Sequence, residues 1–325
     1  MATTLSARDI VETITIRFGY DRYDYKVVPG LYCVGNPTPE SPVLVTCNYK
    51  LTFDMVRKEL KGTDAWLLIA DTRGINVWCA AGKDLFSTEE IMLSVTSSRL
   101  AEIVSHRELI LPQLGATGVA AHKVRKGCGF KVTYGPVWAS DLPAFMENRK
   151  TATEAMRTVT FTLAQRVELI PVELFTLGKP LLCIALAAFL LSGIGPDIFS
   201  VSAAWERGLA ALCATIAGIL AGNILVPVFL SRLPWRMFSP KGALMGLAVG
   251  TLNGLLFTSF LTLGDSVALV LWSSAVGSYL AMNFTGSTPF TSPTGVEKEM
   301  RRFIPLQIAT SLLALITWIA APFMG

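Results

Sequence analysis

Five long apolar runs fill the second half of the 325-residue chain and constrain its fold more than any other feature. They lie near 180–199, 208–230, 242–263, 265–284 and 303–323. Each run is close to the roughly 20 residues that a helix needs to cross the hydrocarbon core of a bilayer. A water-soluble domain built from five such runs would have too little polar surface. The pattern therefore predicts an all-α transmembrane domain of about five helices.

Charged residues divide the chain into two unlike parts. Up to Glu168 there are 20 Lys and Arg and 18 Asp and Glu, whereas from Leu169 onward there are 8 and 6. We therefore expect a soluble domain at 1–166 and a transmembrane domain at 167–325. The first 17 residues lack the apolar core of a signal peptide. A net charge of +4, spread along the chain, gives no reason to expect a nucleic-acid partner.

Positive charges between the apolar runs predict the orientation in the membrane. Those on one side are Lys179, Arg232, Arg236, Lys241, Lys298, Arg301 and Arg302. The loops on the other side offer Arg207, Asp197 and Asp265, and no charge is expected in the middle of a span. We expect a multi-pass protein of the cell's inner (cytoplasmic) membrane, with its soluble domain in the cytoplasm.

The soluble part alternates apolar β-branched runs with helical patterns. Strands are expected at 42–46, 65–70, 109–111 and 130–133, and helices at 52–61, 87–104 and 141–149. This alternation predicts an α/β Rossmann-like domain with a parallel sheet. Ligands of such folds bind beyond the carboxyl ends of the strands.

One cysteine lies beyond such a strand end, in the stretch NVWCAAGK at 76–83. Cys79 could be a small buried hydrophobic residue, a soft-metal ligand or a reactive thiol. The stretch is not a phosphate-binding loop, because that motif needs Gly at position 77 and Ser or Thr at 84, which are Val77 and Asp84. The two histidines, His106 and His122, have no recognisable catalytic context. The residues alone leave these alternatives open.

The six cysteines show neither a CxxC pair nor zinc-ligand spacing. We therefore expect no iron–sulfur cluster on this chain. Any electrons that its chemistry needs would come from another protein.

The octapeptide NVWCAAGK closely resembles the cap-helix signature of the HgcA family, the corrinoid proteins of microbial mercury methylation. This family is distantly similar to the corrinoid iron–sulfur proteins of acetyl-CoA synthesis. The resemblance implies a cobalamin-type corrinoid cofactor, with Cys79 as the catalytic residue and the axial ligand of its cobalt. It implies that the cap over the corrin consists of Asn76, Val77, Trp78, Cys79, Ala80, Ala81, Gly82 and Lys83.

Two further segments complete the expected cofactor site. The stretch 45–50 resembles a Val-Thr-x-Asn-Tyr-Lys segment of the family, which implies that Thr46 and Asn48 touch the corrin, although a simple turn role stays open. The Gly-containing loop 112–118 is a candidate for the cofactor's nucleotide tail, through Gln113, Gly115 and Gly118, since glycine lets backbone approach a ligand closely. The segment GVEKEMRR at 295–302 extends the resemblance into the membrane part.

The family resemblance implies transfer of a methyl group from a methyl–Co(III) corrinoid to inorganic Hg(II). It also implies a ferredoxin-like partner with two [4Fe–4S] clusters (HgcB-like) and a methyl donor, either a protein or a folate-type compound. An anionic thiolate on cobalt should favour delivery of the methyl group to an electrophile. We expect the polar loop after 283 to dock the soluble domain or its partner.

Two other functions stay open from sequence. One is a membrane-anchored corrinoid methyl carrier with a different natural acceptor. The other is a membrane thiol or transport protein without a corrinoid.

Overall fold

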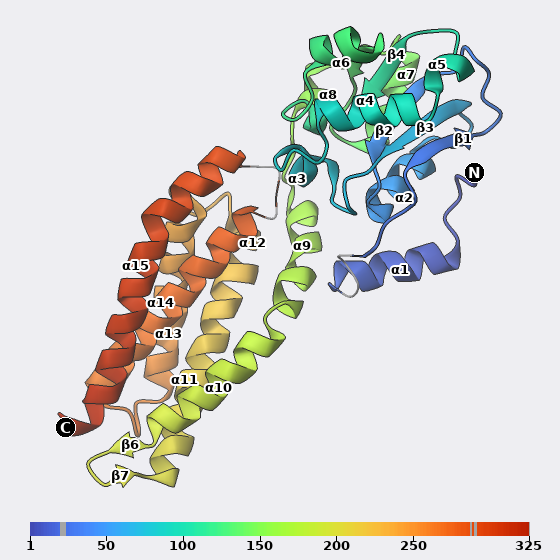
Figure 1. Cartoon of the computed structure of the whole chain (residues 1–325). Coiled ribbons are helices and arrows are strands. Elements are labelled where there is room, and N and C mark those ends of the chain that lie inside the picture. The colour runs from blue at the N-terminus through green and yellow to red at the C-terminus, as the bar shows by residue number, and fades with distance from the viewer. Residues whose placement is uncertain (20–23, 287, 289–290, 325) are drawn as a thin grey trace. The chain divides into compact units, whose positions relative to one another are not determined.

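The computed structural model describes residues 1–19, 24–286, 288 and 291–324 and forms two compact units, Met1–Thr160 and Phe161–Gly325 (Figure 1). The expected domain boundary after Arg166 falls inside a helix of the second unit, α9 (Leu163–Phe175). Each unit has its own core and is described by itself.

A five-stranded sheet organises the first unit. Its strands are β1 (Gly30–Val34), β2 (Val43–Cys47), β3 (Ala65–Ala70), β4 (Glu108–Leu111) and β5 (Lys131–Tyr134), in the order β1-β3-β2-β4-β5. Strands β2 to β5 run parallel, as expected, but β1 is an antiparallel edge strand beside β3. The sheet is therefore mixed. The order of its parallel strands is that of flavodoxin-like folds and not of the dinucleotide-binding Rossmann fold.

Helices cover both faces of this sheet. The helical segments are α1 (Ala7–Arg17), α2 (Lys50–Glu59), α3 (Val77–Ala81), α4 (Thr88–Ser97), α5 (Leu100–Ile103), η1 (Gln113–Gly115), α6 (Ala121–Cys128), η2 (Ala139–Asp141), α7 (Leu142–Glu147) and α8 (Glu154–Arg157). One core lies between the sheet and α3, α4 and α6, and the other between the sheet and α2 and α7. The single helix expected at 87–104 is divided, because Arg99 has a left-handed backbone (φ 51°).

The chain reverses its winding direction between β2 and β4. From β2 it goes through α2 to β3 on one side, and from β3 it crosses to β4 on the other side of β2. The carboxyl ends of β2 and β4 therefore border the switch point of the sheet, where open α/β folds bind their ligands.

The second unit is a helical bundle. Its elements are α9, α10 (Gly178–Ser192), β6 (Ile194–Gly195), β7 (Ile198–Phe199), α11 (Val201–Leu220), the π-helical segment η3 (Ala221–Leu225), α12 (Val226–Phe229), α13 (Phe238–Leu256), α14 (Leu263–Gly286), α15 (Pro293–Ala320) and η4 (Ala321–Phe323). The loop expected to dock a partner lies partly outside the described residues, and α14 already includes its first residues.

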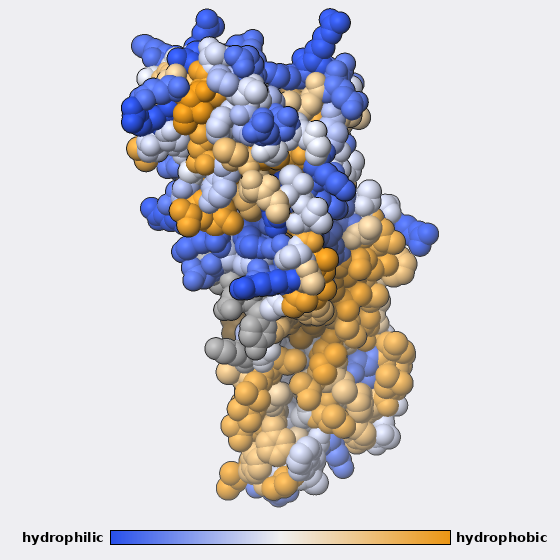
Figure 2. Space-filling view, turned by 90° about the vertical axis from the view of Figure 1, so that its right-hand side faces the viewer, coloured by the Kyte–Doolittle hydropathy of each residue, from blue (hydrophilic) through white to orange (hydrophobic). Residues whose placement is uncertain are grey.

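Fewer helices meet the length and composition of a membrane span than the five apolar runs predict. Among the described residues, Val201–Phe229, Leu263–Gly286 and Thr294–Phe323 do so, and α9 with α10 forms a fourth candidate bent by 57°. The run at 242–263 ends early as a helix, because α13 stops at Leu256. Hydrophobic residues dominate the surface of this unit in Figure 2.

Helix α13 packs closely on α14 through four glycines spaced four residues apart. A Cβ atom on Gly242 would lie 2.2 Å from the Gly277 carbonyl oxygen, and one on Gly246 would lie 2.3 Å from that of Ser273. Small residues at such spacing let membrane helices approach at backbone distance. The succession of partners from Gly242 with Gly277 to Gly254 with Ser266 shows that the two helices are antiparallel.

A buried ion pair joins α11 to α14. Arg207 and Asp265 were expected in loops but lie within helices. Arg207 Nη2 lies 2.9 Å from Asp265 Oδ1. The guanidinium also donates to the carbonyl of Ser192 at 2.9 Å and lies 4.3 Å from the Trp318 ring centroid. This arrangement ties α10, α11, α14 and α15 together near one end of the bundle.

Candidate functional site

The expected site residues come from three loops at one edge of the sheet. These loops follow the carboxyl ends of β2, β3 and β4, which are parallel and adjacent. They contain Asn48, the stretch 76–83 and the loop 112–118 respectively. The fold thus brings together segments that are far apart in sequence.

Asn48 organises the loop that carries α3. Its Oδ1 accepts hydrogen bonds from the backbone of Thr72 (3.1 Å) and Gly74 (2.9 Å) and from the Thr72 hydroxyl (2.9 Å). Its Nδ2 donates to Asp71 Oδ1 at 2.9 Å. The carboxylate of Glu90 holds the same loop by accepting from the backbone of Asp71. The buried amide of Asn48 therefore makes its hydrogen bonds to this turn, in line with the turn role that the sequence left open.

Helix α3 presents Cys79 at the protein surface. The side chain of Asn76 caps the helix by accepting from the Cys79 backbone at 2.9 Å. Cys79 and Trp78 are half-buried, Val77 is buried, and Gly82 and Lys83 are exposed. The cap residues are thus not equivalent, and Cys79 and Trp78 lie where a ligand could reach them.

The small residues of α3 accommodate the protein's own loop. Ala80 and Ala81, both expected in the cap over the corrin, are buried. A Cβ on Gly118 would lie 3.0 Å from Ala81 Cα, and one on Gly115 would lie 2.6 Å from the Phe86 ring. The two glycines therefore let the loop 112–118 pack on α3 and Phe86. This contact gives them a structural role beside the expected one in tail binding.

Two buried polar atoms near this edge find no hydrogen-bond partner within the described parts of the chain. They are Oε1 of Gln113, which follows β4, and the indole Nε1 of Trp138, which follows β5. A backbone hydrogen bond from Gln113 to Pro136 (3.4 Å) joins the two loops. Buried donors and acceptors are usually paired, so these two atoms are available for hydrogen bonds to a bound group. Gln113 was expected in the site, whereas sequence reasoning missed Trp138.

Thr46 is buried in the middle of the sheet. Alternation along β2 puts its side chain on the same face as Leu44, which belongs to the core under α2 and α7. Val45 and Cys47 lie on the opposite face, in the core that includes α3. Among the expected cofactor-binding residues, Thr46 is therefore turned away from the cap.

The cysteines of the first unit differ in accessibility. Cys47 is fully buried, and this burial raises the pKa of its thiol. Cys33 is exposed on the edge strand β1, and Cys79 is half-buried at the switch-point edge of the sheet. Cys128 is also half-buried but ends α6, which leads into the start of β5 at the other edge of the sheet. Among these four cysteines, Cys79 is therefore the accessible one at the switch-point edge.

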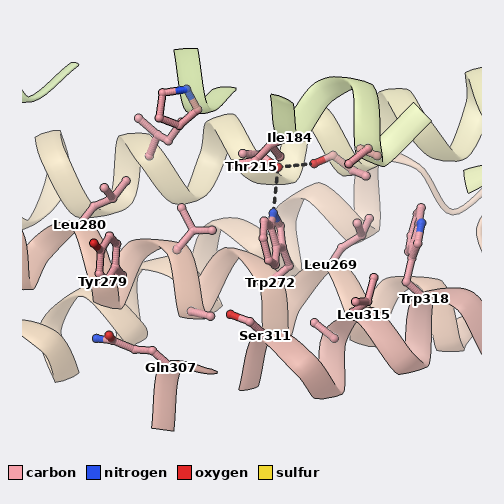
Figure 3. Close-up of a pocket in the computed structure, with 18 of the residues that line it drawn as sticks. Ile184, Thr215, Leu269, Trp272, Tyr279, Leu280, Gln307, Ser311, Leu315 and Trp318 are labelled. Carbon is pink, nitrogen blue, oxygen red and sulfur yellow. Dashed lines mark hydrogen bonds between the residues drawn. The ribbon is translucent and has the colours of Figure 1, made fainter. Parts of the chain in front are cut away.

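The second unit contains a groove of about 1020 Å³ between α10, α11, α14 and α15 (Figure 3). Leu, Ile, Ala and Trp side chains form most of its wall, and the described residues that line it include no Asp, Glu, Lys or Arg. Trp272 donates from Nε1 to the Thr215 hydroxyl at 2.8 Å within this wall. Such a groove suits apolar chains. It offers no charged path of the kind that ion transporters use.

Comparison with known proteins finds sequence similarity within the first unit. Residues 4–146 match the family model of the CO dehydrogenase/acetyl-CoA synthase delta subunit. The gamma subunit of the acetyl-CoA decarbonylase/synthase complex of Methanopyrus kandleri is 34% identical over 128 residues, which cover 39% of this chain and 27% of that protein. The gamma subunit of Archaeoglobus fulgidus is 30% identical over 143 residues, covering 42% and 30%. The similarity to these subunits therefore lies within the first unit.

The similarity confirms the more distant of the two resemblances seen in the sequence, that to the proteins of acetyl-CoA synthesis. It includes the sheet, α3 and the loops at the switch point, since all of them lie within 4–146. The chain spans less than one third of the length of these curated relatives, at 27% and 30%. The matched residues end before the second unit begins.

Proposed function

We propose that this chain is a membrane-anchored corrinoid protein that transfers a methyl group to inorganic Hg(II), giving methylmercury. The observation that carries the proposal is Cys79, an accessible thiol on a capped helix at the switch-point edge of the sheet. The stretch NVWCAAGK around it resembles the signature of the mercury-methylation family. Relatives from acetyl-CoA synthesis support corrinoid binding by the first unit.

The unpaired polar atoms at the site fit a corrinoid. Its corrin ring carries peripheral carboxamides, which both donate and accept hydrogen bonds. The Gln113 Oε1 acceptor and the Trp138 Nε1 donor could each pair with such a group, relieving the cost of leaving them unpaired and buried. A carboxylate-rich ligand or a simple cation would satisfy one of the two atoms and not both.

Each part of the chain has a distinct task in this proposal. A bound corrinoid would supply the methyl group on its cobalt. The Cys79 thiolate would bind the cobalt, and its electron density would favour delivery of the methyl group to an electrophile such as Hg(II). Asn76 fixes the backbone of Cys79, and Asn48 fixes the preceding loop. Lys83, exposed after the helix, could stabilise the thiolate charge.

The reaction also needs partners. Reducing equivalents would come from a ferredoxin-like protein with two [4Fe–4S] clusters. The methyl group would come from a methyl donor protein or a folate-type donor.

We further propose that the second unit crosses the cell's inner (cytoplasmic) membrane five times, with the first unit in the cytoplasm. Contacts from Arg207 with Asp265 to Gly222 with Gly277 run in the same direction along the span Val201–Phe229 and along α14, so these two candidate spans are parallel. Two parallel spans require the chain to return across the membrane between them. Helix α13, antiparallel along α14, is the segment that can do so.

A second candidate is a membrane-anchored methyl carrier whose natural acceptor is not mercury. The similarity to subunits of the acetyl-CoA decarbonylase/synthase complex favours it. The architecture of the corrinoid site would be the same in both cases. Only the acceptor differs.

Two measurements test these proposals in sequence. The visible spectrum and cobalt content of the purified chain should show one corrinoid per protein; a cobalt-free protein would contradict both candidates. Single-turnover assays of the methylated protein should then give methylmercury from Hg(II). Retention of the methyl group in the presence of Hg(II) would contradict the mercury proposal and leave the carrier function.

A further inference from the structure

Helix α1 of the first unit is oriented with its polar side toward the protein. Asp9 and Glu12 face the protein, together with the buried Ile16. The opposite side carries Ile10, Val11, Ile14 and Phe18, whose exposed fractions are 50%, 61%, 52% and 52%. Surface helices normally bury the apolar stripe and expose the polar one. In α1 this arrangement is reversed.

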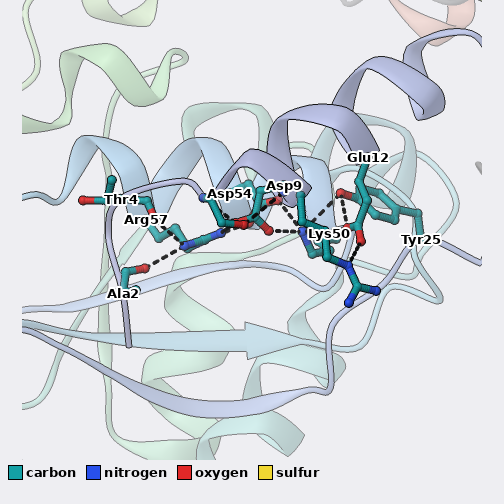
Figure 4. Close-up of polar contacts among 10 residues, drawn as sticks. Ala2, Thr4, Asp9, Glu12, Tyr25, Lys50, Asp54 and Arg57 are labelled. Atoms are coloured by element: carbon teal, nitrogen blue, oxygen red, sulfur yellow. Dashed lines mark hydrogen bonds and ion pairs between the residues drawn. The ribbon is translucent and has the colours of Figure 1, made fainter.

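A network of ion pairs fixes this orientation (Figure 4). Lys50 Nζ lies 2.8 Å from Asp9 Oδ1 and 3.3 Å from Glu12 Oε2, and Arg57 Nη2 lies 3.0 Å from Asp9 Oδ2. Both cations also contact Asp54, at 2.8 Å for Lys50 and 2.7 Å for Arg57, and the Asp54 carboxylate is fully buried. Rotating α1 to bury its apolar side would break these pairs. Lys50 and Arg57 would then lose the carboxylates of α1, and positive charge beside Asp54 would be left unbalanced.

The apolar residues form one continuous stripe. Ile10, Ile14 and Phe18 are four residues apart and therefore lie on one side of a helix, and Val11 adjoins them. Single exposed hydrophobic residues are common on soluble proteins, but a contiguous patch marks a contact with another surface. No described residue of the first unit covers this stripe.

The short connection between the two units indicates which surface covers the apolar stripe of α1. Helix α8 ends at Arg157 and α9, the start of a candidate membrane segment, begins at Leu163. The five connecting residues, 158–162, span roughly 18 Å at most when fully extended. A unit tethered so briefly to the helix that leads into the first apolar run stays near the bilayer surface. A single convex helix with an apolar side suits the boundary between lipid headgroups and acyl chains.

Charge supports the same surface. The acidic side chains of α1 are engaged with Lys50 and Arg57. Arg8, beside the stripe, pairs with Glu12 at 2.7 Å, yet 87% of its side chain is exposed. Anionic lipids of the cytoplasmic leaflet attract exposed basic residues.

We propose that α1 lies on the cytoplasmic surface of the bilayer, with Ile10, Val11, Ile14 and Phe18 inserted among the lipid headgroups. The network to Lys50 and Arg57 holds the rest of the first unit to this helix and so sets the unit's orientation on the membrane. This inference rests on the proposed membrane crossing of the second unit and does not depend on the corrinoid or on mercury.

The test places the photoreactive residue p-benzoylphenylalanine at Ile14 of the full-length chain. The protein is reconstituted in bilayers of phosphatidylethanolamine and phosphatidylglycerol, irradiated, and analysed by mass spectrometry. The matched control carries the same residue at Leu93, which is 62% exposed on α4. We expect lipid adducts at position 14 to exceed those at position 93 several-fold. Adducts to peptides of this chain or of a partner, or equal lipid adducts at both positions, would overturn the proposal.

A second variant removes the stripe. Ile10→Gln with Val11→Gln should reduce the lipid adducts at position 14 several-fold, whereas Leu93→Gln should leave them unchanged. Extraction with alkaline carbonate shows separately whether the second unit is integral to the membrane. Cobalt content, measured on the same samples, separates a failure of this inference from a failure of corrinoid binding.

Discussion

At the residue scale, two thiols of the first unit differ in what they can reach. Cys47 ends β2 inside the core, where burial raises its pKa, and Cys79 is half-buried on α3. Only an accessible thiol can bind a ligand from outside the core. The difference between them comes from burial and not from sequence context.

Cys79→Ala should abolish methylmercury formation while the protein still inserts into the membrane. Loss of a direct ligand should cost more than the roughly 10–100-fold that removal of an outer-shell partner costs. The measurement is methylmercury produced from Hg(II) by membranes containing equal amounts of each variant. Cys79→His should keep low activity, because imidazole binds cobalt without the charge of a thiolate.

Cys33→Ser is the matched control for Cys79→Ala. It removes an exposed thiol on β1, away from the switch-point edge, and should leave activity unchanged. Near-normal methylation by Cys79→Ala would contradict the proposed role of this thiol.

Asn48→Ala should loosen the loop before α3. The change leaves the backbone of Thr72 and Gly74 without their acceptor, and each buried unsatisfied group costs about 1–3 kcal/mol. Hydrogen exchange of 71–76 should therefore quicken by roughly tenfold or more, since about 1.4 kcal/mol corresponds to tenfold. Exchange of α7 in the same protein serves as the internal reference. Unchanged protection of the loop would show that the Asn48 amide does not hold it.

At the scale of elements, the attachment of α1 to α2 should depend on pH. Hydrogen bonding from Lys50, with help from Ser6 and Arg57, holds the pKa of Asp9 well below its usual range. A depressed carboxylate pKa adds stability above the unfolded value, about 3.9, and this stability is lost as pH falls below it. Hydrogen exchange of 7–17 should show α1 attached at pH 7 and released progressively below about pH 4.

Asp9→Asn tests the cause of this attachment. At pH 7 the variant should weaken the attachment of α1 by about 1–3 kcal/mol, and its difference from the parent protein should shrink as pH falls. Asp24→Asn removes an exposed partner of Lys26 outside the network and should have no effect. Equal exchange in the Asp9 and Asp24 variants at pH 7 would contradict the anchoring role.

The glycines of α13 allow a second test at this scale. Gly246→Ala puts a Cβ 2.3 Å from the Ser273 carbonyl oxygen and must push α13 from α14, at a cost of about 1–3 kcal/mol. Gly254→Ala, on the same stripe, meets its nearest atom at 3.4 Å and should have little effect. Thermal unfolding of the two variants in detergent should therefore differ. Similar midpoints would mean that the close packing of α13 contributes little to stability.

At the scale of the whole molecule, the number of membrane crossings decides where the C-terminus lies. Crossings by α9 with α10, α11, α13, α14 and α15 put it on the side opposite the first unit, because their number is odd. Reporters fused after Thr160 and at the end of the chain should therefore give opposite signals.

A reporter between α13 and α14 serves as the internal check of this topology. Placed at 257–262, it should report the same side as the C-terminal one. If it instead reports the side of the first unit, α13 does not cross, and the return between two parallel spans must be explained otherwise.

The sequence by itself determined most of the local structure. Apolar β-branched runs correspond to β2 to β5, and apolar runs of about 20 residues correspond to the long helices. Both patterns can be recognised because they depend only on residues close together in the chain. The position of Cys79 beyond the end of β3 also followed from local residue types. The resemblance of its short motifs pointed to relatives that comparison confirmed for 4–146.

Only the tertiary structure decided what each local pattern contacts. Asn48 accepts hydrogen bonds from the turn before α3, and Ala81 packs against a loop more than thirty residues later in the chain. The sheet order brings these segments together. The ion pair of Arg207 with Asp265 joins residues far apart in sequence. For α1, only the structure shows that the segment is a helix and which side of it faces the protein. The partners Lys50 and Arg57 lie on α2, and their charges turn the polar side of α1 inward and its apolar side out.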